Sequence, residues 1–257
     1  MYKKGKINEI SNDYCRVCRT KAVILPLLIH RTLSKGVLIR DNEVMRYDTY
    51  IFDLDGTLLN SIDDLAISCN YALNAFGMPQ YSVDEIKSFV GNGVHKLLER
   101  SVPNGIENSK FNDVLNLFQK HYLIHNTDHT CPYTGIMDML SQLKQHSKQV
   151  AVVSNKFCKA TQELVEHYFG NAVDIAIGES DTIRKKPAPD MVLAAMRQLH
   201  ATPDTAVYIG DSDVDIQTAS NSGLPCISVL WGFRSRPFLI EHGAKTLVSR
   251  PADILYI

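Results

Sequence analysis

The sequence TYIFDLDGT, residues 49–57, joins a short apolar run to two carboxylates, Asp53 and Asp55. A run of four such residues bounded by a glycine turn is typical of a buried strand in an α/β sheet. Residues two apart in extended chain point to the same side, so both carboxylates are expected to face one site at the strand end. Gly56 permits the tight exit that lets backbone approach an anion there.

Working outward from this strand, apolar runs alternate with helical stretches along the rest of the chain. The further predicted strands are residues 149–153, 173–177, 206–209, 226–229 and 246–248. The predicted helices between them are residues 135–144, 159–168, 188–199 and 213–220. Strand alternating with helix predicts an α/β fold with a doubly wound parallel sheet, Rossmann-like, with helices on both faces.

Residues 61–132 interrupt this alternation with helical windows at 62–76, 83–89, 94–101 and 108–125. They predict a helical cap domain inserted into a core made of residues 47–60 and 133–257. We expect it to move, with hinges near Asn60–Ser61 and Pro132–Tyr133. Residues 1–46 show no sustained period and are interpreted as an amino-terminal appendage, with the native chain expected to begin at Met45.

Composition excludes several classes of partner. The 257 residues carry 27 Lys and Arg against 28 Asp and Glu, so no general positive field exists to bind nucleic acid. No apolar run approaches the roughly 20 residues of a membrane helix, so no membrane partner is expected. Six cysteines without a disulfide framework favour a cytoplasmic location. The oligomeric state, monomer or homodimer, stays open.

Four polar segments are expected at one edge of the sheet, where ligands of open α/β sheets bind. Three of them follow predicted strands, and one precedes a predicted helix. After the pair at Asp53 come Ser154-Asn155-Lys156, then Lys185-Lys186-Pro187, then Asp211 to Asp215. Clustered carboxylates predict a hard cation such as Mg²⁺, which prefers few carboxylates together with phosphate and water. The expected ligand is therefore a small-molecule phosphate ester.

These motifs, in this order between Tyr47 and Ile257, resemble those of haloacid dehalogenase superfamily phosphatases with a helical cap. The resemblance implies that Asp53 is the nucleophile, forming an aspartyl-phosphate, and that Asp55 is the general acid and base. It further implies catalytic roles for Ser154 and Lys186. The implied ligands of Mg²⁺ are Asp53, the backbone carbonyl of Asp55, Asp211 and Asp215, the last directly or through water. Thr57 and Asn155 are expected to help bind substrate.

The segment from Phe89 to Arg100 resembles the corresponding part of phosphoglycolate phosphatases. Gly91 and Gly93 would let backbone dip toward the site, and Asn92, His95 and Lys96 are expected to meet a substrate carboxylate. The most specific prediction is therefore magnesium-dependent hydrolysis of 2-phosphoglycolate.

Other activities fit the same motifs. The enzymatic alternatives are a sugar-phosphate phosphatase, a nucleotidase, an inorganic pyrophosphatase and a mutase of the β-phosphoglucomutase type, which returns phosphate to its substrate. Dehalogenation is disfavoured because dehalogenases of the superfamily lack an acid at the position of Asp55. A non-catalytic module that binds a phosphorylated ligand is the alternative of another class, in which these acids only form turns and helix caps.

Overall fold

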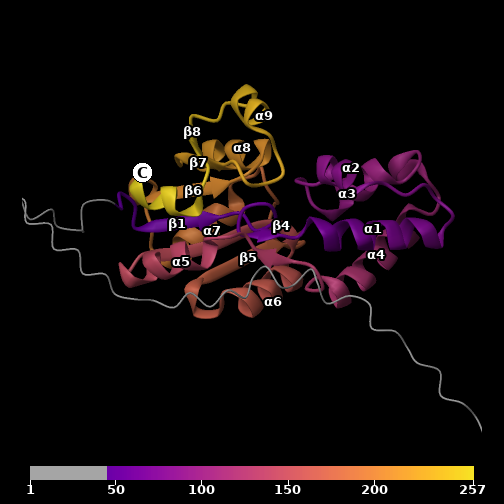
Figure 1. Ribbon diagram of the computed structural model, residues 1–257, viewed down its shortest axis with the longest axis horizontal. Helices are drawn as coiled ribbons and strands as arrows, with labels where there is room; N and C mark the ends of the chain where they lie inside the picture. The colour runs from indigo at the N-terminus through magenta and orange to yellow at the C-terminus, as the bar shows by residue number, and fades with distance from the viewer. Residues whose placement is uncertain (1–44) are drawn as a thin grey trace, which may run out of the picture. The chain divides into compact units, whose positions relative to one another are not determined.

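The computed structural model describes residues 45–257, so the predicted appendage, apart from Met45 and Arg46, lies outside the described residues. Six parallel strands form one sheet in the order β5-β4-β1-β6-β7-β8 (Figure 1). In chain order they are β1 (Thr49–Phe52), β4 (Gln149–Phe157), β5 (Ile175–Glu179), β6 (Ala206–Gly210), β7 (Cys226–Val229) and β8 (Thr246–Val248). Because β1 lies between β4 and β6, the chain order reverses beside it, which is where open α/β sheets bind ligands.

Side chains of β1 alternate between two hydrophobic clusters, as the pleat of a strand requires. Tyr50 and Phe52 pack in one cluster and Ile51 in the other, and all three are fully buried. The first cluster is completed by α5 (Ile136–Gln145), α6 (Cys158–Tyr168) and the 3-10 helix η5 (Pro251–Tyr256). The second is completed by α7 (Asp190–Leu199) and α8 (Asp213–Asn221). Helices cover both faces of the sheet, so the predicted doubly wound α/β core is confirmed.

Four helices between β1 and β4 have a hydrophobic cluster of their own. They are α1 (Ile62–Ala75), α2 (Val83–Phe89), α3 (Val94–Ser101) and α4 (Phe111–His125), which Figure 1 shows gathered together. Ser82 begins α2 with a capping box, its hydroxyl accepting from the Glu85 N–H while Glu85 accepts from the Ser82 N–H. Fully buried Leu73 and Phe118, from α1 and α4, lie in the shared cluster. Burial of each such side chain contributes about 1.5–3 kcal/mol.

A two-residue strand pair joins the two places where the chain enters and leaves this helical segment. β2 (Leu59–Asn60) is antiparallel to β3 (Cys131–Pro132). Beside it the buried carboxylate of Asp64, in α1, accepts hydrogen bonds from the N–H groups of His129 and Thr130 and from the Thr130 hydroxyl. These bonds hold the chain at residues 129–130, just before β3, against α1.

The remaining described elements are short: η2 (Gly105–Glu107), η3 (Gly170–Ala172), η4 (Pro203–Thr205) and α9 (Arg236–Glu241). Among residues 45–257, no helix combines the length and apolarity needed to cross a membrane.

One strand differs from its prediction in a way that matters for the site. The apolar run predicts a strand ending at Val153, but β4 continues to Phe157. Its pairing with β5 shifts register between Val153 and Phe157, as a β-bulge does. Ser154, Asn155 and Lys156 are therefore buried residues of β4, near its carboxyl end, and the strand fixes the directions of their side chains.

Candidate active site

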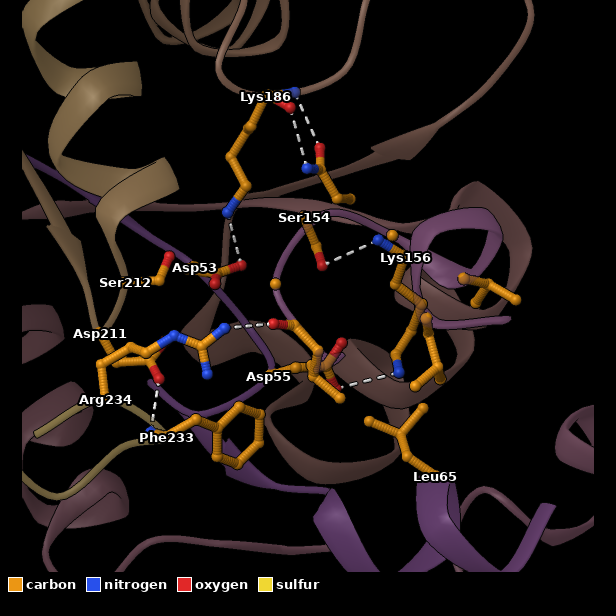
Figure 2. A pocket seen from close by; sticks show the side chains of 16 residues that line it. Asp53, Asp55, Leu65, Ser154, Lys156, Lys186, Asp211, Ser212, Phe233 and Arg234 are labelled. Atoms are coloured by element: carbon orange, nitrogen blue, oxygen red, sulfur yellow. Dashed lines mark hydrogen bonds and ion pairs between the residues drawn. The ribbon is translucent and has the colours of Figure 1, made fainter. Parts of the chain in front are cut away.

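A pocket lies at the carboxyl ends of β1, β4 and β6, where the core meets the helical segment (Figure 2). The core lines it with side chains that include Asp53, Asp55, Ser154 and Lys186. The helical segment lines it with apolar groups and glycine backbone, including Leu65, Gly91, Gly93 and Leu97. A polar floor under an apolar roof is suited to holding a small charged ligand away from bulk water.

Three buried carboxylates meet on the floor of the site. Each of Asp53, Asp211 and Asp215 offers an oxygen, and these oxygens lie within 4.8 Å of one another. Burial and the neighbouring Asp215 raise the pKa of Asp211 to about 7. Burial and Asp215 also raise the pKa of Asp53 well above its usual range, although Lys186 opposes them. Lys186 thus offsets only part of the negative charge of the three carboxylates, and a bound cation would offset the rest.

The position of Asp211 depends on two glycines. A Cβ atom at Gly56 or at Gly232 would overlap the Asp211 side chain, so the absence of side chains at both positions lets this carboxylate pack directly against the backbone. Gly56 also has φ +88°, a conformation that favours glycine. Asp211 accepts one hydrogen bond of 2.6 Å from the Phe233 N–H and a longer one of 3.4 Å from the Thr57 hydroxyl. Its remaining lone pairs are available for a metal.

Asp215 differs from the other two because hydrogen bonds occupy both of its oxygens. Oδ1 accepts from Lys186 Nζ at 2.8 Å and from the Tyr208 hydroxyl at 3.0 Å. Oδ2 accepts from the Ser212 N–H at 3.1 Å and from the Ser212 hydroxyl at 2.6 Å. Four donors on one fully buried carboxylate suit a group that orients Lys186 better than one that binds a metal directly.

Lys186 lies between two carboxylates, with Nζ 2.8 Å from Asp53 Oδ1 and 2.8 Å from Asp215 Oδ1. Burial alone would lower its pKa, but Asp215 and Asp53 outweigh burial and raise it, so the ammonium stays charged. Asn155 holds the backbone of this lysine, since its amide donates to the Lys186 carbonyl at 3.0 Å and accepts from the Lys186 N–H at 2.7 Å. The structure thus gives Asn155 a positioning contact.

Asp55 lies apart from the three-carboxylate cluster and has its own partners. Its Oδ1 accepts from the Ser61 hydroxyl at 2.5 Å and pairs with Lys156 Nζ at 2.9 Å. Lys156 also donates to the Tyr122 hydroxyl of α4 at 2.6 Å. Sequence reasoning assigned Lys156 no role, although it stands directly after Ser154 and Asn155. The signal that could have identified it is a lysine inside an otherwise buried strand end, because such a charge requires a partner.

The pocket is lined by six of the residues predicted for the site: Asp53, Asp55, Ser154, Asn155, Lys186 and Asp211. Thr57, expected to bind substrate, and Asp215, expected to bind metal, are fully buried and do not line it, although they contact Asp211 and Lys186. Asn92, His95 and Lys96, expected to meet the substrate, do not line this pocket. His95 and Lys96 are 50% and 47% exposed and face Glu99 on the outer side of α3. The cause is helical periodicity. Because α3 packs against the other helices through Val94 and Leu97, the two residues between them, His95 and Lys96, lie on a different side of the helix.

Two pocket residues, Phe233 and Arg234, come from the loop between β7 and α9. The Phe233 N–H binds Asp211, as described above. Arg234 donates to two carbonyls at the end of α2, Nη1 to Lys87 at 2.9 Å and Nη2 to Val90 at 2.5 Å. Neither residue was predicted, because both follow the strand at 226–229 and lie outside the four polar segments expected at this edge of the sheet.

Comparison with known proteins agrees with this geometry. Residues 50–229 match the family of haloacid dehalogenase-like hydrolases. The chain is 31% identical over 207 residues to a phosphoglycolate phosphatase of Aquifex aeolicus, covering 80% of this chain and 93% of that one. It is 33% identical over 215 residues to a phosphoglycolate phosphatase of Cereibacter sphaeroides, covering 80% and 96%.

A solved structure of a protein from Lactobacillus delbrueckii subsp. bulgaricus superimposes with a TM-score of 0.78. The two are 39% identical, and the match covers 82% of this chain and 98% of that one. The family match and the structural match therefore agree. The chain belongs to the haloacid dehalogenase-like hydrolases.

Proposed function

We propose that this chain hydrolyses 2-phosphoglycolate with Mg²⁺, through an aspartyl-phosphate formed on Asp53. Its family and its phosphatase relatives make it a phosphoric monoester hydrolase. The observation that carries the mechanism is the placement of Asp53, which lies in the carboxylate cluster, contacts Lys186 and opens into a pocket that also contains Asp55. The similarity to phosphoglycolate phosphatases supports the choice of substrate.

In the first step Asp53 acts as the nucleophile. Its Oδ1 is held by the Leu54 N–H at 2.7 Å and by Lys186, which leaves Oδ2 to form the bond to phosphorus. As that bond forms, the bond from phosphorus to the glycolate oxygen breaks, and Asp55 donates its proton to the leaving oxygen. Lys186 and the Ser154 hydroxyl bind phosphoryl oxygens, which keeps the group in line during transfer.

In the second step Asp55 takes a proton from water, and the water oxygen attacks phosphorus. The bond from phosphorus to Asp53 breaks, phosphate leaves, and both carboxyl groups return to their starting states. Asp55 can serve in both steps because Ser61 and Lys156 hold its Oδ1, leaving Oδ2 to carry the proton. The apolar roof limits the access of other water molecules.

Asp53 and Asp211, together with the backbone carbonyl of Asp55, are the residues proposed to hold Mg²⁺. When bound, the ion screens the approach of an anionic carboxylate to an anionic phosphate. Asp215 supports the site through Lys186 and Ser212.

Magnesium is expected to stabilise the folded protein as well as support turnover. Binding at about 100 times the dissociation constant adds roughly 2.7 kcal/mol, which raises Tm of a chain this size by about 5–10 °C. Thermal unfolding with excess MgCl₂ and with EDTA measures the difference. In Asp211→Asn the shift should shrink to less than about 2 °C. An equal Tm in both conditions for the unaltered protein would contradict a site at this cluster.

Lys156→Met is expected to lower kcat by about 100-fold, because Asp55 loses the ammonium that positions it, while KM changes little. Steady-state kinetics of the two proteins measure this difference. Lys159→Met is the matched control, because that lysine is 72% exposed and pairs with Glu163 at 3.8 Å. An unchanged kcat in Lys156→Met would show that Asp55 does not depend on this contact.

We also propose that residues 61–132 form a cap domain on a core of residues 47–60 and 133–257. Their separate hydrophobic cluster supports this division, as does the β2–β3 pair at the two chain crossings. The predicted hinges at Asn60–Ser61 and Pro132–Tyr133 lie at the ends of that pair. Motion there would admit substrate and then exclude water.

Phosphate release from 2-phosphoglycolate, compared with sugar phosphates, a nucleotide and pyrophosphate, tests the substrate assignment. We expect the highest kcat/KM for 2-phosphoglycolate. A higher value for another member of the panel would move the assignment to that class. Recovery of an isomeric phosphate ester instead of free phosphate would indicate a mutase, and no turnover of any substrate would indicate a binding module.

A further inference from the structure

We propose that Arg234 binds the carboxylate of the substrate and so selects phosphate esters that carry a second anionic group. This inference rests on the proposed phosphatase function and adds to it the part of the site that recognises the leaving group. It assigns the role to a core loop, in place of the helical residues that the sequence suggested.

The charge balance of the pocket sets Arg234 apart from the other cations. Three cationic side chains line it: Lys156, Lys186 and Arg234. The two lysines are matched by carboxylates, Lys156 by Asp55 at 2.9 Å and Lys186 by Asp53 and Asp215 at 2.8 Å each. Within residues 45–257, Arg234 makes no ion pair, and its two hydrogen bonds go to neutral carbonyls. Its charge favours the ionised form of Asp211, and so lowers the pKa of that carboxyl, without direct contact. Its N–H donors are therefore not held by a carboxylate, and its charge can act on a ligand.

The geometry of Arg234 also suits it to bind a carboxylate. A guanidinium has five N–H donors, and the Lys87 and Val90 carbonyls use two of Arg234's. Those two bonds fix the plane of the group, and Figure 2 shows it directed into the pocket. A planar donor already held in place loses little conformational entropy on binding a carboxylate, whose two oxygens match its spacing.

The other cations of the site have roles at the phosphoryl group or lie outside the pocket. In the proposed mechanism Lys186 and Ser154 bind the phosphoryl group, so a substrate with a second anion needs another cation. His95 and Lys96 cannot supply it in this structure, because they face Glu99 outside the pocket. Arg234 follows directly after Phe233, whose N–H binds Asp211, so its loop is fixed to the reacting end of the site.

A different reading is that Arg234 only caps the end of α2, where a cation is favourable. The experiment must separate this role from binding. Arg100 offers the matched control, because it also donates to a carbonyl at the end of α2, that of Phe89 at 2.6 Å, but does not line the pocket.

The test compares Arg234→Gln and Arg100→Gln on two substrates, 2-phosphoglycolate and 2-hydroxyethyl phosphate, which carries a neutral hydroxymethyl in place of the carboxylate. We expect Arg234→Gln to lower kcat/KM for 2-phosphoglycolate by about 100-fold and for 2-hydroxyethyl phosphate by less than about threefold. Arg100→Gln should change both by less than about threefold. Arg234→Lys should recover part of the preference, because the charge remains but the paired donors do not.

The outcomes distinguish this inference from the function beneath it. Equal losses on both substrates in Arg234→Gln, or a loss in Arg100→Gln that matches it, would overturn the inference while leaving the phosphatase intact. If the unaltered protein shows no preference between the substrates, 2-phosphoglycolate is not its selected substrate and the carboxylate site falls with it. Thermal unfolding of each variant identifies losses caused by a damaged fold.

Discussion

Asp53→Asn is expected to lower phosphate release by roughly 10⁴-fold or more while the protein stays folded. The amide retains an oxygen that can accept from the Leu54 N–H and Lys186, as Oδ1 does. It has no lone pair suited to attack phosphorus in place of Oδ2. Removal of one of three buried carboxylates also relieves repulsion within the cluster, so stability should not fall.

Steady-state kinetics and thermal unfolding of the same preparation check both parts of this expectation. Asp213→Asn is the matched control, because Asp213 begins α8 beside the site but is not part of the carboxylate cluster. Substantial turnover by Asp53→Asn would remove this residue as the nucleophile. If Asp53→Asn does not fold, its loss of turnover says nothing of the nucleophile, and the stereochemical course at phosphorus in the unaltered protein decides instead.

Lys186→Met is expected to cause the largest loss of stability, about 3–5 kcal/mol, together with loss of turnover. The substitution keeps the length of the side chain but leaves Asp53 and Asp215 without the ammonium that both contact at 2.8 Å. Because typical domains unfold at a cost of about 5–15 kcal/mol, this is a large fraction of the total. Denaturant unfolding gives the free-energy difference directly.

Lys185→Met serves as its control, since that side chain is 38% exposed and pairs with Glu179 at 3.2 Å near the surface. It should cost less than about 1 kcal/mol. Adding Asp215→Asn to Lys186→Met should recover part of the lost stability, because one of the two unpaired charges is removed. A loss in Lys186→Met no larger than in Lys185→Met would show that the buried lysine does not stabilise the carboxylates.

Much of the fold could be predicted because its signals are local. The bounds of β1, β7 and β8 coincide with apolar runs, and those of α2 and α3 with helical windows between glycine and proline breaks. The β2–β3 pair could not be predicted in this way. Each strand has only two residues and forms only through pairing with a partner some seventy positions away. The extension of β4 was missed because its last residues are polar, and their burial depends on partners from elsewhere.

In the candidate site too, residues fixed by local sequence could be predicted, whereas contacts fixed by tertiary packing could not. Asp53, Asp211 and Asp215 could be placed together because each follows a strand of one parallel sheet. Lys156 and Arg234 have long side chains, and what they contact depends on packing between the core and the helical segment. No pattern near either residue specifies those contacts.

The stereochemical course at phosphorus tests the central claim most directly. 2-Phosphoglycolate carrying a chiral, isotopically labelled thiophosphoryl group is hydrolysed in isotopically labelled water, and the configuration of the released thiophosphate is determined. Two successive in-line displacements, first by Asp53 and then by water, predict net retention. Net inversion would mean that water attacks the substrate directly and would contradict an aspartyl-phosphate on Asp53.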